Sequence, residues 1–219
     1  MVSVEMFCHN DSASDLASID TLSSADVLAA ARSLQRRERQ LLARTVFLAD
    51  RMAAVIVDDL LAADRLTHRH INDIGDKVVV GEVAVRLNIS RYRARTWLTL
   101  ASALRGFPKV LDAFLRGTYS LERTSIIIGE LGVLSDNTAE GMRIRDEAER
   151  VALQLADADS HDLVLRDRIA EMVIALDPEG AAAGRREHAR RRQHVTVKSD
   201  INGHASITAS VSAEFLIRQ

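Results

Sequence analysis

The stretch GEVAVRLNISRYRARTWLTLASAL, residues 81–104, predicts two short helices joined by a tight turn. Aliphatic residues up to Leu87 give the first helix an apolar face, and Asn88 and Ile89 supply the turn. Ser90 is a good N-cap for the helix that follows it. This order of elements is that of a helix-turn-helix, in which the first residues of the second helix reach base edges in the major groove.

The second helix of this pair has an apolar stripe and a basic face. Ala94, Trp97, Leu98 and Ala101 recur at helical spacing and are predicted to pack inward. The stretch 81–104 holds four Arg and one Glu, a net charge of +3. The alternative is a purely architectural helix pair whose arginines are only solvated. The candidate DNA-binding residues on the basic face are Ser90, Arg91, Tyr92, Arg93 and Arg95.

A second basic region lies near the end of the sequence. Residues 185–198 hold six basic residues and one acidic residue, a net charge of +5, whereas residues 1–31 hold five acidic residues and no Lys or Arg. Such an asymmetry indicates a surface that meets a polyanion, although a solvated helix face explains the run equally well. The candidate phosphate contacts are Arg185, Arg186, Arg190, Arg191, Arg192 and Lys198.

The first third of the chain predicts one unusually long helix. After a leader over residues 1–20, which we expect to be acidic and disordered, N-cap candidates at 21–24 precede an apolar pattern that runs to about Arg65. A helix of this length should cross the whole molecule as a spine or pair with a second copy. Its predicted buried seam consists of Leu41, Leu48, Val55 and Ile56.

The fold class predicted from these patterns is mainly α. We expect a helical bundle over residues 21–177, with the long N-terminal helix, the helix-turn-helix-like pair at 82–104 and further amphipathic helices. Residues 178–219 predict a basic helix and a small C-terminal β-hairpin, because two alternating β-branched runs flank Asn202-Gly203, a pair suited to a type I′ turn.

Composition limits the class of protein. The chain has 219 residues, 47% hydrophobic and 27% charged, with a net charge of -2, a profile typical of a soluble globular protein. Its single cysteine, Cys8, cannot form an internal disulfide or a site with several thiolates. A secretory signal and an apolar run long enough for a membrane span are both missing from the sequence, so we expect no membrane partner and a cytoplasmic location.

Enzymatic chemistry finds little support in the sequence. It contains neither GxGxxG nor GxxxxGK[ST]. The polar cluster from Asp157 to Asp162 is better explained as helix capping than as a hydrolytic or metal site. His68 and His70 lie in a turn region without paired cysteines. We therefore expect no catalytic residue, metal, cofactor or small-molecule substrate.

The order of the motifs resembles the N-terminal region of the actinobacterial 13E12 repeat family, also known as domain of unknown function 222. The resemblance rests on residues 82–104, 107–128, 175–197 and 202–214. Members of that family continue into a C-terminal HNH nuclease domain, of which this sequence shows nothing. The resemblance implies a non-catalytic, DNA-associated accessory domain, truncated before the nuclease. A helical interaction or oligomerisation module, and a shortened family copy without separate activity, are the alternatives.

Overall fold

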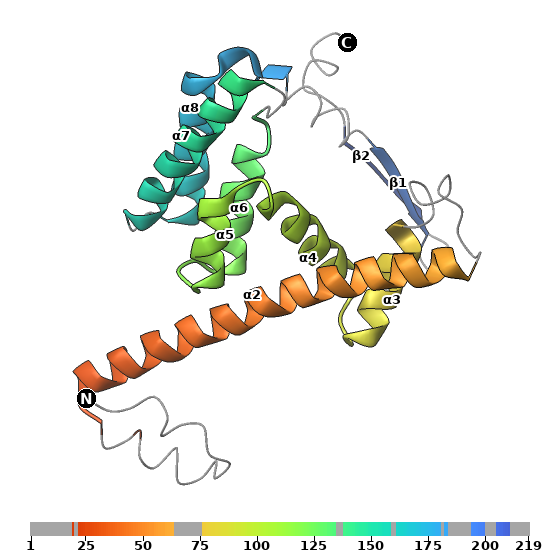
Figure 1. Cartoon of the computed structure of the whole chain (residues 1–219), viewed down its shortest axis with the longest axis horizontal. Coiled ribbons are helices and arrows are strands. Elements are labelled where there is room, and N and C mark those ends of the chain that lie inside the picture. Colours follow the sequence, from red (N-terminus) through yellow and green to blue (C-terminus); the bar gives the residue numbers. More distant parts are fainter. Residues whose placement is uncertain are drawn as a thin grey trace. The chain divides into compact units, whose positions relative to one another are not determined.

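A computed structural model describes residues 19, 22–63, 76–134, 138–158, 161–180, 182–183, 194–199 and 205–210. The fold over these residues is mainly helical (Figure 1). The chain divides into two compact units, residues 1–128 and 129–219. The boundary falls inside the range 21–177 that the sequence predicts as one helical domain, because the helices within residues 24–115 pack among themselves and the two within residues 139–176 pack on each other.

The long helix exists and forms the backbone of the first unit. Helix α2 spans Ser24–Ala62, 39 residues, or about 58 Å. The Ser23 side chain caps it by accepting a hydrogen bond from the Asp26 backbone N–H at 3.3 Å. The predicted end near Arg65 is three residues too late, because Ala63 has already left helical geometry. In Figure 1, α3 (Asp76–Arg86) lies beside the C-terminal half of α2.

The predicted buried seam of α2 is wrong except at Ile56. Leu41 and Leu48 are 58% and 68% exposed, and Val55 is also exposed. The helix instead packs against its neighbours through small residues, which let the other helices come close. Leu48 lies five residues from both Ala43 and Ala53, so it points about 140° away from them around the helix. The buried residues of α2 are Ala43, Val46, Ala49, Ala53 and Ile56.

Three shorter helices contact α2. They are α3 (Asp76–Arg86), α4 (Arg91–Leu104) and α5 (Pro108–Leu115). Arg105, just after α4, forms an ion pair with Asp50 of α2. Proline occupies the first turn of α5, where its missing N–H costs no helical hydrogen bond. These contacts hold α3 and α4 on one side of the long helix, which positions the predicted helix-turn-helix.

The end of α5 confirms the predicted glycine stop. Gly117 has φ 67°, a left-handed conformation that a glycine adopts without a steric penalty. Its N–H donates to the Phe114 carbonyl at 3.0 Å. Next to it, the Gln40 side chain of α2 donates to the Arg116 carbonyl at 3.0 Å. The turn after α5 is therefore hydrogen-bonded to α2.

Helix α6 spans Leu121–Leu131 and begins at the predicted cap. Ser120 Oγ accepts a hydrogen bond from the Arg123 N–H at 3.2 Å. Thr124, Ile127 and Leu131 are buried at three- and four-residue spacing, as the sequence pattern predicts.

The second unit contains a helix pair and two strands. Helix α7 spans Ala139–Asp157 and helix α8 spans Asp162–Leu176. His161, rather than one of the neighbouring aspartates, is the N-cap of α8, and its Nδ1 accepts from the Leu163 N–H at 3.4 Å. Each helix buries one face, with alanines at four-residue spacing on α7 and larger aliphatic residues at the same spacing on α8. The buried residues are Ala148, Ala152 and Ala156 on α7, and Leu165, Ile169 and Val173 on α8.

Two strands near the C-terminus, β1 (His194–Ser199) and β2 (Ala205–Ser210), pair in antiparallel orientation. In the observed register Ser199 is opposite Ala205. A two-residue turn at Asn202-Gly203 would instead place Ser199 opposite Ser206, so the pairing differs by one residue from the one that this turn requires. The connecting residues 200–204 and the leader 1–18 lie outside the described residues. The predicted hairpin, with its type I′ turn, is thus not confirmed.

Candidate nucleic-acid interface

The segment 81–104 folds as two helices joined by a tight turn. Helix α3 ends at Arg86 and α4 begins at Arg91. Between them Asn88 adopts φ 51°, the left-handed conformation that Asn tolerates better than most residues. The Ile89 N–H then donates to the Ala84 carbonyl at 2.9 Å and closes the turn. The turn prediction at Asn88 and Ile89 is confirmed, although α3 begins earlier than Gly81, at Asp76.

The inward face of α4 follows the predicted pattern with one exchange. Ala94, Trp97 and Ala101 are buried, whereas Leu98 is only partly buried and Leu100 takes its place in the core. Leu100 follows Trp97 by three residues and so lies on the same face of the helix. Because α4 is enclosed by α2, α3 and α5, its core face is wider than the sequence stripe suggested.

The N-terminus of α4 carries only positive charge. Ser90 Oγ accepts a hydrogen bond from the Arg93 N–H at 3.1 Å, which confirms the predicted cap. The first turn of α4 contains no acidic residue. Free backbone N–H groups at a helix N-terminus favour a negative partner, so arginines at this end raise an already positive local potential.

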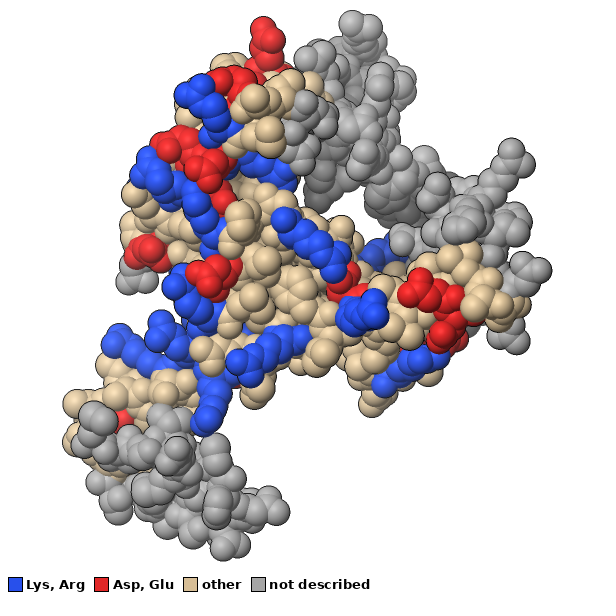
Figure 2. Space-filling model, viewed as in Figure 1, with Lys and Arg blue, Asp and Glu red and all other residues tan. Residues whose placement is uncertain are grey.

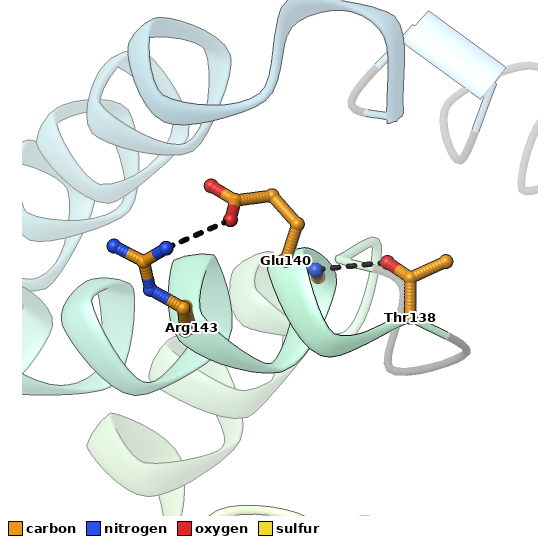
Figure 3. A network of polar contacts seen from close by, with 4 residues as sticks. Thr138, Glu140 and Arg143 are labelled. Atoms are coloured by element: carbon orange, nitrogen blue, oxygen red, sulfur yellow. Dashed lines mark hydrogen bonds and ion pairs between the residues drawn. The ribbon is translucent and has the colours of Figure 1, made fainter.

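The first turn of helix α7, unlike that of α4, contains an acidic residue. In Figure 3 the Thr138 hydroxyl accepts a hydrogen bond from the Gly141 N–H at 2.9 Å, as Ser90 does for Arg93 in α4. The first turn of α7, however, carries Glu140, which pairs with Arg143 at 3.1 Å. That carboxylate and its partner compensate the positive end of α7 internally. The N-terminus of α4 has no such compensation in its own first turn.

Three of the candidate DNA-binding side chains share one exposed face. Arg91 and Arg95 are one helical turn apart, and Tyr92 beside them is 82% exposed. Arg93 is also exposed but lies nearer the core, with its guanidinium 5.8 Å from the centre of the Trp97 ring. This distance is typical of a cation–π contact, which orients Arg93 along the helix. The spacing of four residues between Arg93 and Trp97 could have predicted the contact.

The arginines of this face form no ion pair with any carboxylate that the structure describes, in contrast to Arg86 on α3. Arg86 lies 3.6 Å from Glu82, an i,i+4 pair at the surface. Guanidinium groups that lack a carboxylate partner keep their full capacity to bind phosphate or a base edge.

The second predicted basic cluster cannot be placed next to the first. Residues 184–193, which include all five candidate arginines of the C-terminal run, lie outside the described residues. Lys198 belongs to β1, where it is opposite Ser206. The phosphate-binding role of the whole cluster remains a prediction from the sequence.

The second unit also has a shallow hollow, which shows no ligand-binding chemistry. It encloses about 760 Å³ between the start of α7, from Ala139 to Glu147, and Leu176 of α8. Glu140 on its wall is paired with Arg143, and Glu147 is paired with Arg150. These carboxylates are therefore already used within α7, and the basic face of α4 is the stronger candidate site.

A model of the domain of unknown function DUF222 matches residues 20–215. The chain belongs to this family. No curated protein and no solved structure matches the chain.

Two features of the described part of this DUF222 chain concern membranes and metals. None of the described helices is both long and apolar enough to cross a membrane. In the same part of the chain, no three His, Cys, Asp or Glu side chains gather as metal ligands would.

Proposed function

We propose that this DUF222 chain is a non-catalytic DNA-binding module that inserts the start of α4 into the major groove. The observation that carries the proposal is the exposed N-terminal face of α4, with Arg91, Tyr92 and Arg95 above a capped helix end that has no acidic residue in its first turn. Helices α2 and α3 hold α4 from behind, as a helix-turn-helix requires.

The three side chains have different roles in this proposal. Arg95 and Arg91 can each donate two hydrogen bonds to the O6 and N7 atoms of guanine, or bind phosphate oxygens. The Tyr92 hydroxyl can donate a hydrogen bond to a phosphate oxygen. Arg93, held against the Trp97 ring, contributes positive charge at the edge of the interface. The basic run at 185–192 adds phosphate contacts that carry no sequence information.

The role of an accessory domain to an HNH nuclease follows from the family resemblance. A DNA-bound module would position a nuclease on its substrate without taking part in the chemistry. Because DNA is its proposed partner, we also place the protein in the cytoplasm, as the sequence predicts.

Replacement of Arg95 by Ala is expected to weaken binding to a selected duplex by about 1–3 kcal/mol, roughly 5- to 150-fold. The loss on random DNA should be smaller because only a phosphate-like contact is lost there. Fluorescence anisotropy against selected and random duplexes, over a series of salt concentrations, measures both. Arg143→Ala removes the same charge from α7, where Arg143 is exposed and paired, and should leave the preference between duplexes unchanged.

The salt series also separates the two basic regions. A triple Ala variant at residues 190–192 should weaken binding to all sequences alike and reduce the salt slope by about one unit per lost phosphate contact. If the wild-type chain binds no DNA more tightly than about 10⁻⁴ M at low salt, its affinity is below ordinary non-specific binding and the proposal fails.

The chain is expected not to cleave DNA. The proposed contact face of α4 offers guanidinium, phenol and hydroxyl groups but no carboxylate or imidazole that could activate water. A supercoiled plasmid incubated with the chain and Mg²⁺, Mn²⁺, Ni²⁺ or Zn²⁺ should remain supercoiled. Nicking that co-purifies with the protein and disappears with EDTA would contradict the prediction.

A further inference from the structure

Helix α2 exposes large apolar side chains in a heptad repeat. Val27, Leu34, Leu41, Leu48 and Val55 follow one another at intervals of seven residues, and all five are exposed. The series runs from residue 27 to residue 55, about 42 Å along the helix. We call these five residues the heptad stripe. An apolar residue at every seventh position is one of the two apolar positions by which one helix packs along another in a coiled coil; the second, three residues later, is occupied here by Arg37, Arg44 and Arg51.

The core of the first unit does not use the heptad stripe. The buried face of α2 runs through Ala43, Val46 and Ala53, and Leu48 points about 140° away from both alanines. The apolar residues of the stripe therefore have a spacing that the fold itself does not need. Singly exposed leucines are ordinary on a protein surface, but five at one fixed period form a row that turns by only about 20° around the helix per heptad.

Positive charge lines the outer side of the heptad stripe. Arg37, Arg44 and Arg51 each follow a stripe leucine by three residues, so each lies one turn farther on the same face. All three are exposed. Figure 2 shows basic side chains over the N-terminal and central parts of α2. The surface that a partner would meet is thus a row of leucines with guanidinium groups along one side and Glu38, Thr45 and Met52 along the other.

The arginines beside the heptad stripe indicate which kind of partner it binds. A parallel second copy would place Arg44 against the same arginine of its partner. Like charges at a helix seam are destabilising. An antiparallel copy centred on Leu41 would place Arg44 opposite Glu38 but would leave Arg51 opposite Ala31, without a carboxylate. A bilayer surface needs a broad apolar face, whereas the heptad stripe is one residue wide. A partner helix with acidic residues beside its own apolar stripe can pack on the leucines and pair with the arginines.

We propose that the heptad stripe of α2 binds an acidic amphipathic helix of another protein, with apolar residues in heptads and Asp or Glu beside them. Leu34, Leu41 and Leu48 pack between the apolar residues of that helix. Arg44 and Arg51 pair with its carboxylates at the rim, where such pairs give selectivity more than affinity. The proposal concerns α2 alone and does not depend on DNA binding by α4.

The test uses a synthetic helical peptide of 28 residues with Leu at heptad positions and Glu beside them. The control peptide has Lys in place of each Glu. In fluorescence anisotropy with the full-length chain, the Glu peptide should bind saturably and at least tenfold more tightly than the Lys peptide. Similar affinities for both peptides, or no binding of the Glu peptide, would overturn the proposal.

Substitutions on α2 test whether the peptide binds to the heptad stripe. Leu48→Asp should weaken binding of the Glu peptide at least tenfold without changing the melting temperature, because Leu48 is 68% exposed. Arg44→Glu should weaken it as well and improve binding of the Lys peptide. Leu163→Asp alters a similarly exposed leucine of α8 and should change nothing. Binding that survives Leu48→Asp would overturn the proposal.

Two further measurements address the other occupants. Sedimentation equilibrium of the free chain should show a monomer, and a stable dimer that Leu48→Asp abolishes would assign the heptad stripe to a second copy instead. Vesicles of anionic phospholipid should not retain the chain in a pelleting assay. Retention that Leu48→Asp abolishes would assign the stripe to a membrane surface and overturn the proposal.

Discussion

Replacing Val46 with Asp is expected to unfold the first compact unit, at a cost of about 4 kcal/mol or more. Val46 is fully buried in α2, where an unpaired carboxylate would lose its hydration and find no cation. The single tryptophan, Trp97, is buried in α4 of the same unit, so its fluorescence reports this unfolding in a urea titration.

The matched control for Val46→Asp lies two residues away. Leu48→Asp puts the same carboxylate on the same helix, but at a position that is 68% exposed. Its stability should change by no more than about 0.5 kcal/mol. Equal losses for both variants would show that the two faces of α2 are assigned incorrectly. This pair therefore tests the main correction that the structure makes to the sequence pattern.

Replacing Gly117 with Ala should destabilise the first unit by about 3 kcal/mol, the second largest expected effect. An Ala at φ 67° adopts a left-handed conformation that disfavours a Cβ atom. The added Cβ would also lie 2.5 Å from the carbonyl oxygen of Arg36, which belongs to the backbone of α2 and cannot rotate away. The turn after α5 or the long helix itself must shift.

Gly129→Ala is the control for this substitution. Gly129 lies in α6, and a Cβ atom there would meet nothing within 4 Å. Ala is favoured over Gly in a helix by roughly 0.5–1 kcal/mol, so this variant should be slightly more stable than the wild type. Urea titrations followed by circular dichroism and by Trp97 fluorescence compare the two. An unchanged midpoint for Gly117→Ala would mean that the turn relaxes freely.

Local residue chemistry was enough to predict the turn and cap within residues 81–104 and the helix stop after α5. Asn88, Ser90 and Gly117 act through their own backbone and side chain, on neighbours within three residues, so their positions in the chain predict the turn, the cap and the helix end. The family also follows from the order of the motifs along the chain. The basic character of the start of α4 was evident for the same reason, because charge is a property of the residues.

Which side of α2 is buried depends on the helices packed against it. Two apolar faces coexist on this helix, one of alanines and Val46, the other of leucines in heptads, and hydrophobicity alone favours the leucines. The packing of α3, α4 and α5 requires close approach, which small side chains permit, so the alanine face is buried and Leu48 is left outside. In the same way Leu100 replaces Leu98 in the core of α4, since several surrounding helices, and not the period of one helix, determine what is enclosed.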